Sequence, residues 1–356
     1  MSKKLKVGLI GAGGMARTVH LPGFGRMDNV EVVAICDIVP EKAEALAEKF
    51  HIPHIFEDYK EMLKMPELDA VDICTPNVWH SIMAVDALEA GLHVFCEKPD
   101  AVSVEEAERM KAAADKSGKT LMVMRNNRYL PSSSFMKEYV EAGKMGEIYA
   151  ARCGWQRRRG IPGKGGWFTT KELSGGGPLI DLGVHMIDLT MWLMGNPKPV
   201  AANGCTYCKF ADNDVSDSVD SNFGEKKADG IFDVEDLAMG FIRFENGACM
   251  QIEFSWASNI EEEQRFYELR GTKAGASWSS ATQKLKIFTE EFGKTIDYLP
   301  NIDDKEISIH TANLRHFANV VLNGAEPMFV PQQGVDMVKI LEAIYKSAEI
   351  GREVLL

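Results

Sequence analysis

LIGAGGMARTVHLP (residues 9–22) places three glycines and an alanine directly after a short apolar run. Gly11, Gly13 and Ala16 fit the pattern G-x-G-x-x-A, which binds dinucleotides when it joins a strand to a helix. The first glycine makes the tight turn, the second lets the backbone approach a pyrophosphate, and the alanine lets the helix pack closely. The start of that helix then offers free N–H groups and a partial positive charge to phosphates.

The next apolar run, residues 30–36, ends at Asp37, which lies 21 residues after Ala16. A carboxylate at this place can accept hydrogen bonds from both ribose hydroxyls and repels a 2′-phosphate. Ile38 follows, and no arginine is adjacent, so the sequence predicts NAD rather than NADP. The alternative is a glycine turn that holds no ligand. The cofactor-binding residues expected in this part of the chain are Gly11, Gly13, Gly14, Met15, Ala16 and Asp37.

Composition and charge exclude several classes of protein. The apolar part of the start, residues 7–10, is shorter than the roughly 7–15 residues of a secretion signal. The net charge of −12, with scattered lysines and arginines, disfavours a nucleic-acid partner. No apolar run approaches the roughly 20 residues that span a bilayer, so we expect no membrane partner. Seven thinly spread cysteines are typical of reduced thiols, and the expected localisation is cytoplasmic.

The chain, at 356 residues, is long enough for two domains. Its first 124 residues alternate strand and helix patterns, and the strands are apolar throughout, as buried parallel strands are. Repeated units of this kind predict a doubly wound parallel sheet, the Rossmann arrangement, over residues 1–125. Helices are expected over residues 40–50, 80–91 and 104–118, the last with Ser103 as its N-cap.

After Arg125 the strands follow one another without helices between them, which predicts a mostly antiparallel sheet in an α/β domain over residues 126–356. Asn246-Gly247 marks a tight hairpin. One helix is expected over residues 178–195 and another over 334–351. The polar, acidic stretch 203–233 is predicted to be a long excursion or mobile loop.

FCEKP (95–99) places Glu97 and Lys98 at the carboxyl end of a predicted strand, which is the ligand-binding edge of such sheets. Lys98 could lie beside the nicotinamide, hydrogen-bond a substrate hydroxyl and stabilise negative charge developing on its oxygen. The alternative is a surface lysine at a strand end.

Asp181 and His185 in GGGPLIDLGVHMIDL (175–189) are four residues apart and share a helix face, which Asp188 extends. A histidine of near-neutral pKa suits proton removal from an alcohol. The preceding glycines, residues 175–177, are expected to leave backbone room for a ligand. The alternative is that the aspartate and histidine satisfy each other inside the core.

Three weaker patterns remain open. Arg157 to Arg159 could grip a carboxylate, a phosphate or sugar hydroxyls, or could be a solvated edge. Trp155 and Trp167 could each offer an aromatic plate to a sugar ring or belong to the core. The lone C-x-x-C of residues 205–208 lacks the partner pair of a zinc site, so no metal is expected.

Together, GLIGAGGMA, AICD, CTPNVWH, CEKP, NRY and GGGPLIDLGVHMIDL resemble the Gfo/Idh/MocA family of sugar oxidoreductases in order and spacing. The resemblance implies a Rossmann domain followed by an α/β domain with an open sheet, which often mediates homo-oligomers. It implies a nicotinamide cofactor and a catalytic set of Lys98, Asp181 and His185. Further cofactor-binding positions are Thr75, Asn77, His80, Glu97, Lys98 and Trp167. Expected substrate-binding residues are Lys98, Arg128, Arg157, Asp181 and His185.

Within the family, residues 157–185 resemble glycoside 3-oxidases, which oxidise the C3 hydroxyl of glucosides. The sequence therefore predicts NAD-dependent oxidation of a secondary hydroxyl, at C3, of a sugar or glycoside. Other reactions on the same scaffold stay open: a polyol or inositol dehydrogenase, a ketosugar reductase, or an NAD-assisted glycosidase. A non-catalytic sensor of NAD or sugar is a further alternative.

Overall fold

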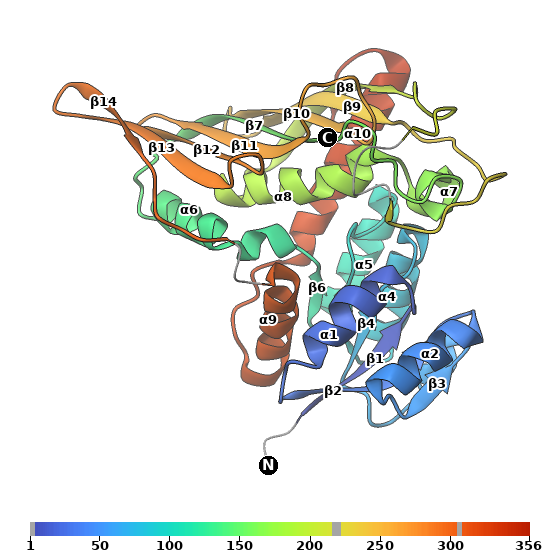
Figure 1. Cartoon of the computed structure of the whole chain (residues 1–356). Coiled ribbons are helices and arrows are strands. Elements are labelled where there is room, and N and C mark those ends of the chain that lie inside the picture. Colours follow the sequence, from blue (N-terminus) through green and yellow to red (C-terminus); the bar gives the residue numbers. More distant parts are fainter. Residues whose placement is uncertain (1–3, 216–221, 305–307) are drawn as a thin grey trace. The chain divides into compact units, whose positions relative to one another are not determined.

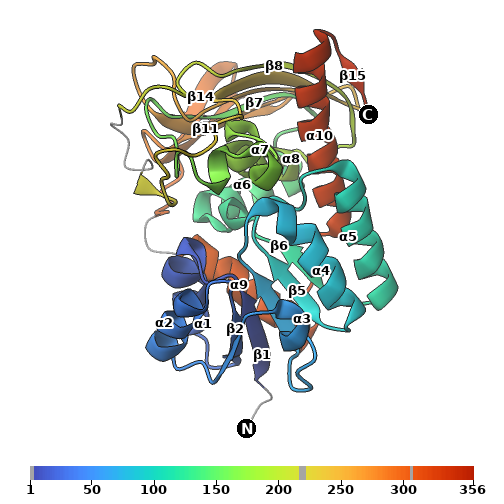
Figure 2. The same cartoon turned by 90° about the vertical axis from the view of Figure 1, so that its right-hand side faces the viewer.

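The computed structural model describes residues 4–215, 222–304 and 308–356 (Figures 1 and 2). The chain divides into two compact units. The first comprises Met1–Asn126 and Ser308–Val335, and the second comprises Asn127–Ile307 and Asp336–Leu356. Across the described residues, every helix is too short or too polar to cross a membrane.

The first unit is built on a parallel sheet of six strands in the order β3-β2-β1-β4-β5-β6. This confirms the predicted doubly wound sheet. The strands are β1 (Leu5–Ile10), β2 (Val30–Cys36), β3 (His54–Phe56), β4 (Ala70–Ile73), β5 (His93–Cys96) and β6 (Leu121–Val123). The helices are α1 (Leu21–Phe24), α2 (Pro40–Phe50), α3 (Tyr59–Met62), α4 (His80–Glu89), α5 (Val104–Ser117) and α9 (Ile309–Asn323).

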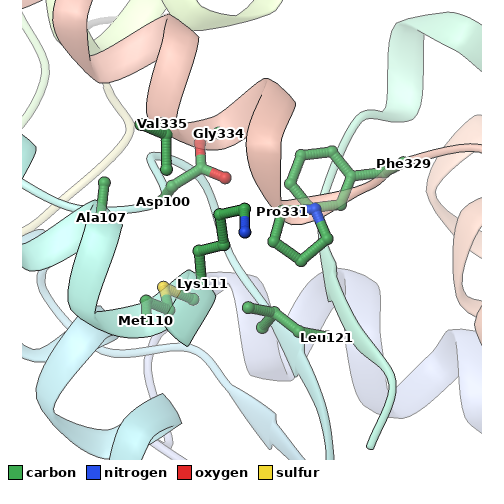
Figure 3. Close-up of a pocket in the computed structure, with 9 residues that line it drawn as sticks. All are labelled: Asp100, Ala107, Met110, Lys111, Leu121, Phe329, Pro331, Gly334 and Val335. Atoms are coloured by element: carbon green, nitrogen blue, oxygen red, sulfur yellow. The ribbon is translucent and has the colours of Figure 1, made fainter. Parts of the chain in front are cut away.

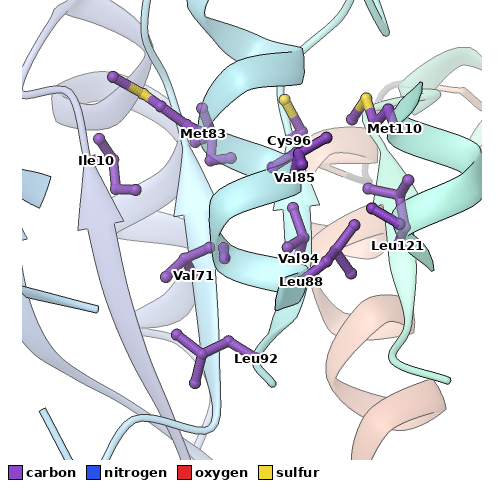
Figure 4. Close-up of a cluster of buried hydrophobic side chains, with 14 of the residues drawn as sticks. Ile10, Val71, Met83, Val85, Leu88, Leu92, Val94, Cys96, Met110 and Leu121 are labelled. Carbon is purple, nitrogen blue, oxygen red and sulfur yellow. The ribbon is translucent and has the colours of Figure 1, made fainter. Parts of the chain in front are cut away.

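Helices cover both faces of this sheet because the strand side chains alternate. Val94 and Cys96 of β5 pack with residues of α4 and α5 in one apolar cluster (Figure 4). Phe95, between them, packs on the opposite face with Phe24 of α1 and Phe317 of α9. The predicted N-cap is confirmed, since the Ser103 hydroxyl accepts a hydrogen bond from the Glu106 N–H at the start of α5.

Helix α9 was not anticipated, and it changes the composition of the first unit. Residues 126–356 were expected to form one domain, but residues 308–335 group with the Rossmann sheet. Leu314, Phe317 and Ala318 supply the reason, because they pack against Leu5 and other strand residues of that sheet. No local sequence pattern links this apolar face of α9 to the sheet, because its strands lie about 190 to 310 positions earlier in the chain.

The second unit is built on a nine-stranded, mixed sheet with the order β14-β13-β12-β11-β7-β10-β9-β8-β15. Among the described strands of this sheet, only β7 and β10 pair in parallel, so the predicted mostly antiparallel sheet is confirmed. Its strands are β7 (Ile148–Gln156), β8 (Pro199–Tyr207), β9 (Leu237–Phe244), β10 (Cys249–Ser255), β11 (Gln264–Gly271), β12 (Ala274–Ser279), β13 (Lys284–Glu291), β14 (Lys294–Tyr298) and β15 (Val354–Leu355).

Helices α6 (Pro131–Glu141) and α8 (Val184–Leu193) lie along one face of this sheet (Figure 1). The short α7 (Lys171–Ser174) precedes α8, and α10 (Pro331–Ile350) contains the point at which the chain passes from one unit to the other. The hairpin at Asn246-Gly247 is confirmed: it joins β9 to β10, and Gly247 has a φ of 86°.

The predicted excursion over residues 203–233 is wrong at its start. Residues 203–207 belong to β8 and pair antiparallel with β9, with Asn203 opposite Phe241 and Tyr207 opposite Leu237. Polar side chains on an exposed strand face carry no local signal that separates them from a loop. Residues 216–221 of the excursion lie outside the described residues.

Candidate functional site

The strand order of the first unit brings the predicted cofactor residues to one edge of the sheet. Gly11 follows β1, Asp37 follows β2, Thr75 follows β4 and Glu97 follows β5. All these strands are parallel, so their carboxyl ends meet at the same edge. The strand order reverses between β1 and β4, and ligands of open α/β sheets bind at that reversal.

The glycine loop has the shape that a pyrophosphate requires. Gly11 has a φ of 97°, and a Cβ atom there would lie 2.6 Å from the carbonyl oxygen of Cys74. At Gly13 and Gly14 a Cβ would meet nothing within 4 Å, so the backbone borders open space. The helical turn that follows is π-helical over Ala16–His20, and Ala16 is fully buried against the sheet. These features fit a dinucleotide phosphate at the start of that helix.

Asp37 is tied to the glycine loop. One carboxylate oxygen accepts a hydrogen bond from the Ala12 N–H at 2.7 Å, and the other accepts one from the Val39 N–H at 2.8 Å. The side chain is half-buried at the end of β2, and Ile38 beside it is exposed. The carboxylate is therefore fixed beside the glycine loop at the end of β2, and the residues of this edge fit NAD.

His80 is fully buried and joins the loops that follow β4 and β5. Its Nε2 lies 2.8 Å from the Thr75 carbonyl oxygen and its Nδ1 lies 2.7 Å from that of Pro99. Burial lowers the pKa of His80. A neutral ring has one N–H, so it donates to one of these carbonyl oxygens and packs against the other. Asn77, in the same loop as Thr75, is also buried.

Glu97 and Lys98 follow β5 with different environments. Lys98 is half-buried, whereas Glu97 is buried, and one of its oxygens lies 2.8 Å from His20 Nε2. Burial alone would raise the pKa of Glu97, but the hydrogen bond and charge of His20 lower it to about 2. His20 was missed by the sequence analysis, although it lies in the stretch that carries the glycine motif.

The second unit places Asp181 and His185 on consecutive helical segments. Asp181 lies in a π-helical turn, Leu179–Gly183, and His185 lies in the first turn of α8. The Asp181 carboxylate accepts a hydrogen bond of 2.9 Å from the indole N–H of Trp256, which is fully buried. The π-helical turn is wider than an α-helical one and is frequent at functional sites. Trp256, 75 residues away, was missed by the sequence analysis.

Gly176 and Gly177, two of the three glycines before this helix, face packed atoms rather than room for a ligand, so the expectation is wrong for these two. A Cβ at Gly176 would lie 2.0 Å from the Tyr345 hydroxyl, and one at Gly177 would lie 2.0 Å from the Glu235 carbonyl oxygen. The buried Glu235 carboxylate also accepts from the N–H groups of Gly177 (2.9 Å) and Leu179 (3.1 Å) and from the Tyr345 hydroxyl (2.9 Å). Glu235 thus caps the helix that carries Asp181.

Trp155, on β7, lies at the centre of a group of donors. Its ring centroid is 5.9 Å from that of His185, and the guanidinium carbons of Arg157 and Arg265 lie 5.3 and 5.0 Å from it. Arg157 is buried, while Arg159 hydrogen-bonds the Ser258 carbonyl at 2.9 Å. A half-buried aromatic plate beside cationic donors and an imidazole suits a polyhydroxylated ring.

Arg128 is committed to Asp188. Its Nε and Nη2 donate to the two carboxylate oxygens at 2.8 and 2.6 Å, and both side chains are buried. Asp188 was predicted to extend the helix face that carries Asp181 and His185. In the structure its carboxylate pairs with Arg128 instead. Trp167, half-buried, stacks on Phe168 with ring centroids 3.8 Å apart. Cys205 and Cys208 are free thiols.

A small pocket of the first unit lies beside α5 and the start of α10 (Figure 3). Met110, Leu121 and Phe329 supply apolar walls, and its charged groups are Asp100 and Lys111. Asp100 is paired with the buried Arg125. The pocket contains no predicted site residue.

Comparison with known proteins divides the chain by sequence, so residues 308–335, which pack with the first unit, fall within the second match. Residues 5–125 match the Gfo/Idh/MocA oxidoreductase family with an NAD-binding Rossmann fold, and residues 137–356 match the C-terminal alpha/beta domain of that family. D-glucoside 3-dehydrogenase of Escherichia coli (strain K12) is 36% identical and covers 99% of this chain and 98% of its own. Levoglucosan dehydrogenase of Pseudarthrobacter phenanthrenivorans is 30% identical over 76% of this chain and 72% of its own. GenD2 from gentamicin A biosynthesis, solved with NAD, is 27% identical with a TM-score of 0.81, covering 100% of this chain and 97% of that one.

Proposed function

The chain belongs to the Gfo/Idh/MocA family of NAD-binding oxidoreductases, and from this premise we propose that it oxidises a secondary hydroxyl of a sugar or glycoside, at C3, to a ketone. The observation that carries the proposal is the group around Trp155 in the second unit, where an imidazole and two guanidinium groups surround an aromatic plate. The similarity to D-glucoside 3-dehydrogenase over nearly the whole chain supports both the substrate class and the position.

We assign the cofactor to the first unit and the substrate to the second. Bound NAD supplies the acceptor for the hydride that leaves the carbinol carbon. His185 takes the hydroxyl proton, a role that suits a half-buried imidazole. Lys98 donates a hydrogen bond to the same oxygen and stabilises its developing negative charge. Asp181, held by Trp256, orients the substrate hydroxyl.

The remaining predicted substrate residues divide into two roles. Arg157, beside Trp155, donates hydrogen bonds to the sugar. Arg128 acts through Asp188, a residue of α8. Two nitrogens of its guanidinium donate to the Asp188 carboxylate, and this buried pair fixes α8. Trp167 and the loops after β1, β2, β4 and β5 complete the proposed cofactor set.

A single-turnover experiment tests the reaction. Protein loaded with stoichiometric NAD is mixed with a panel of glucosides, free hexoses and inositols, and reduced nicotinamide is followed by absorbance. We expect a signal with glucosides and a keto group at C3 by NMR. A signal with inositols alone would show that the substrate is a cyclic polyol and not a sugar or glycoside. Absence of any signal, with NAD shown to be bound, would contradict oxidation and direct the test to ketosugar reduction or to a sensor.

We propose in addition that the sheet of the second unit forms a homo-oligomer. Strand β12 alternates buried and half-exposed residues, so one face of the sheet is covered and the other is open. Phe288 of β13, which pairs with the half-exposed Gly275 of β12, is exposed on that open face, and exposed apolar surface is typical of an association site. Light scattering on the purified protein is expected to give a multiple of the 39.5 kDa chain mass. A monomeric mass at micromolar concentration would contradict this.

A further inference from the structure

His20 lies at the centre of a buried chain of charged groups in the first unit. Its Nδ1 is 2.8 Å from Asp72 Oδ2, in β4, and its Nε2 is 2.8 Å from Glu97 Oε1, after β5. His20 and Asp72 are fully buried, and Glu97 is nearly so. None of the functions argued above uses the imidazole of His20.

The two distances require a hydrogen between the ring and each of the two carboxyl groups. A neutral imidazole has one N–H, so one of its nitrogens would face a carboxylate with a lone pair. Only the imidazolium donates to Asp72 and Glu97 together. Burial opposes a charge on His20, but the charges and hydrogen bonds of Asp72 and Cys74 together raise the pKa of His20 well above its ordinary value. Burial also raises the pKa of Asp72, so the alternative state is a neutral ring that donates to Glu97 and accepts from a protonated Asp72.

The chain of hydrogen bonds ends at the backbone of Lys98. One oxygen of Glu97 is held by His20, and the other accepts a hydrogen bond of 3.1 Å from the Lys98 N–H. On the other side of Lys98, the Pro99 carbonyl is held by the ring of His80 at 2.7 Å. His20 therefore fixes the neighbour on one side of Lys98 through Glu97, and the ring of the buried His80 lies against the neighbour on the other side. The Lys98 side chain itself is half-buried.

We propose that His20 is a positioning residue for Lys98: as an imidazolium between Asp72 and Glu97, it holds the Glu97 carboxylate against the Lys98 N–H and so fixes the backbone that presents the lysine. The expected effect on catalysis rests on the function proposed above. The expected protonation of the imidazole and the ordering of the Lys98 backbone are independent of that function.

A metal ion is the competing explanation of this cluster. Among the described residues, the one group that could supply three metal ligands is His20, Asp72 and Cys74, whose ligand atoms lie within 4.8 Å of one another. A metal would need the lone pair of His20 Nδ1, which the proton donated to Asp72 occupies. Burial also raises the pKa of the Cys74 thiol to about 12, which disfavours the thiolate. The hydrogen-bonded chain accounts for the geometry without a metal.

The test uses the NAD-loaded protein and the variants His20→Gln and Glu97→Gln. The matched control is His54→Gln, since His54 is a half-exposed histidine of the same sheet. At about pH 8, where an ordinary histidine of pKa about 6.5 is neutral, we expect the ¹⁵N resonances of His20 to show two protonated nitrogens. The signal is assigned by its loss in His20→Gln.

Amide hydrogen exchange measures the positioning itself. We expect exchange at the Lys98 N–H to be about tenfold faster in both variants and unchanged in the control. With an active substrate, kcat should fall about 10- to 100-fold in both variants, and in His20→Gln, which alters no proposed cofactor contact, the Kd for NAD should stay within about threefold. Glu97→Gln keeps the size of the side chain, so it preserves the test should His20→Gln fail to fold.

The outcomes separate this inference from the proposed function. A neutral His20 ring, or unchanged exchange at Lys98 in a folded variant, would overturn the inference whatever the substrate is. If the protein oxidises no sugar but exchange at the Lys98 N–H is still faster in the variants, the positioning role of His20 is supported. Only the proposed contribution to catalysis is then lost.

Discussion

Lys98→Ala is expected to abolish sugar oxidation, lowering turnover by about 10³-fold or more, while NAD remains bound. The reason is that the ammonium group is the one cation proposed to act on the reacting oxygen, and a charge stabiliser or acid–base group is typically worth about 10²- to 10⁴-fold. Lys98 follows β5 on a loop held by Glu97 and His80, so its truncation leaves that backbone intact. Single-turnover absorbance measures the rate, and calorimetry measures NAD binding.

Two further variants serve as controls for the effect of Lys98→Ala. Lys64→Ala removes an exposed lysine of the same unit and should change neither quantity. Lys98→Arg keeps a positive charge but alters reach and geometry, so it should recover only part of the rate. Full activity of Lys98→Ala would remove Lys98 from the catalytic set. Loss of NAD binding in that variant would assign the lysine to the cofactor instead.

The sequence predicted the first unit well where local chemistry determines structure. Helix α2 has the predicted bounds, Pro40–Phe50, because proline begins it and His51 ends it in the left-handed conformation. Ser103 caps α5 as expected. The glycine loop and Asp37 were recognisable because a fixed spacing follows from how a dinucleotide meets a strand–turn–helix.

Partners distant in the chain could not be predicted in the same way. The side chains of Trp256 and Glu235, which hold Asp181 and the start of its helix, come from strands or loops more than 50 residues later. The same holds for α9, which was not predicted and whose apolar face covers a sheet formed by the start of the chain. The misinterpreted glycines, Gly176 and Gly177, follow the same rule, since only the packed structure shows that Tyr345 and Glu235 fill the space beside them.

His20 was missed for a different reason. Its position in the glycine-containing stretch was visible, and the sequence places Asp72 and Glu97 at the carboxyl-terminal part of predicted strands. In a parallel sheet these groups converge on one edge. The order β1-β4-β5 of adjacent strands was the missing information, because it alone brings Asp72 and Glu97 to the two sides of one imidazole.

The buried pair of Arg128 and Asp188 is expected to be the most stability-sensitive interaction of the second unit. Asp188→Ala leaves a guanidinium buried without its carboxylate, and breaking such a pair costs about 3–5 kcal/mol. The two charge-assisted hydrogen bonds, at 2.8 and 2.6 Å, and the near-complete burial of both side chains place this pair in that class. Urea unfolding followed by tryptophan fluorescence measures the loss in the free energy of unfolding.

The matched control is Glu245→Ala, which breaks the exposed pair with Lys198 and should cost less than about 1 kcal/mol. The double variant Arg128→Met with Asp188→Leu removes both charges, so it should regain much of the stability lost by Asp188→Ala. That variant also separates the two roles open to Arg128. If Arg128 acts by fixing α8, the KM for the sugar should change only a few-fold in the stable double variant, because no hydrogen bond to substrate is lost. A KM raised by about 100-fold, with the unfolding free energy restored, would show instead that the arginine binds the sugar.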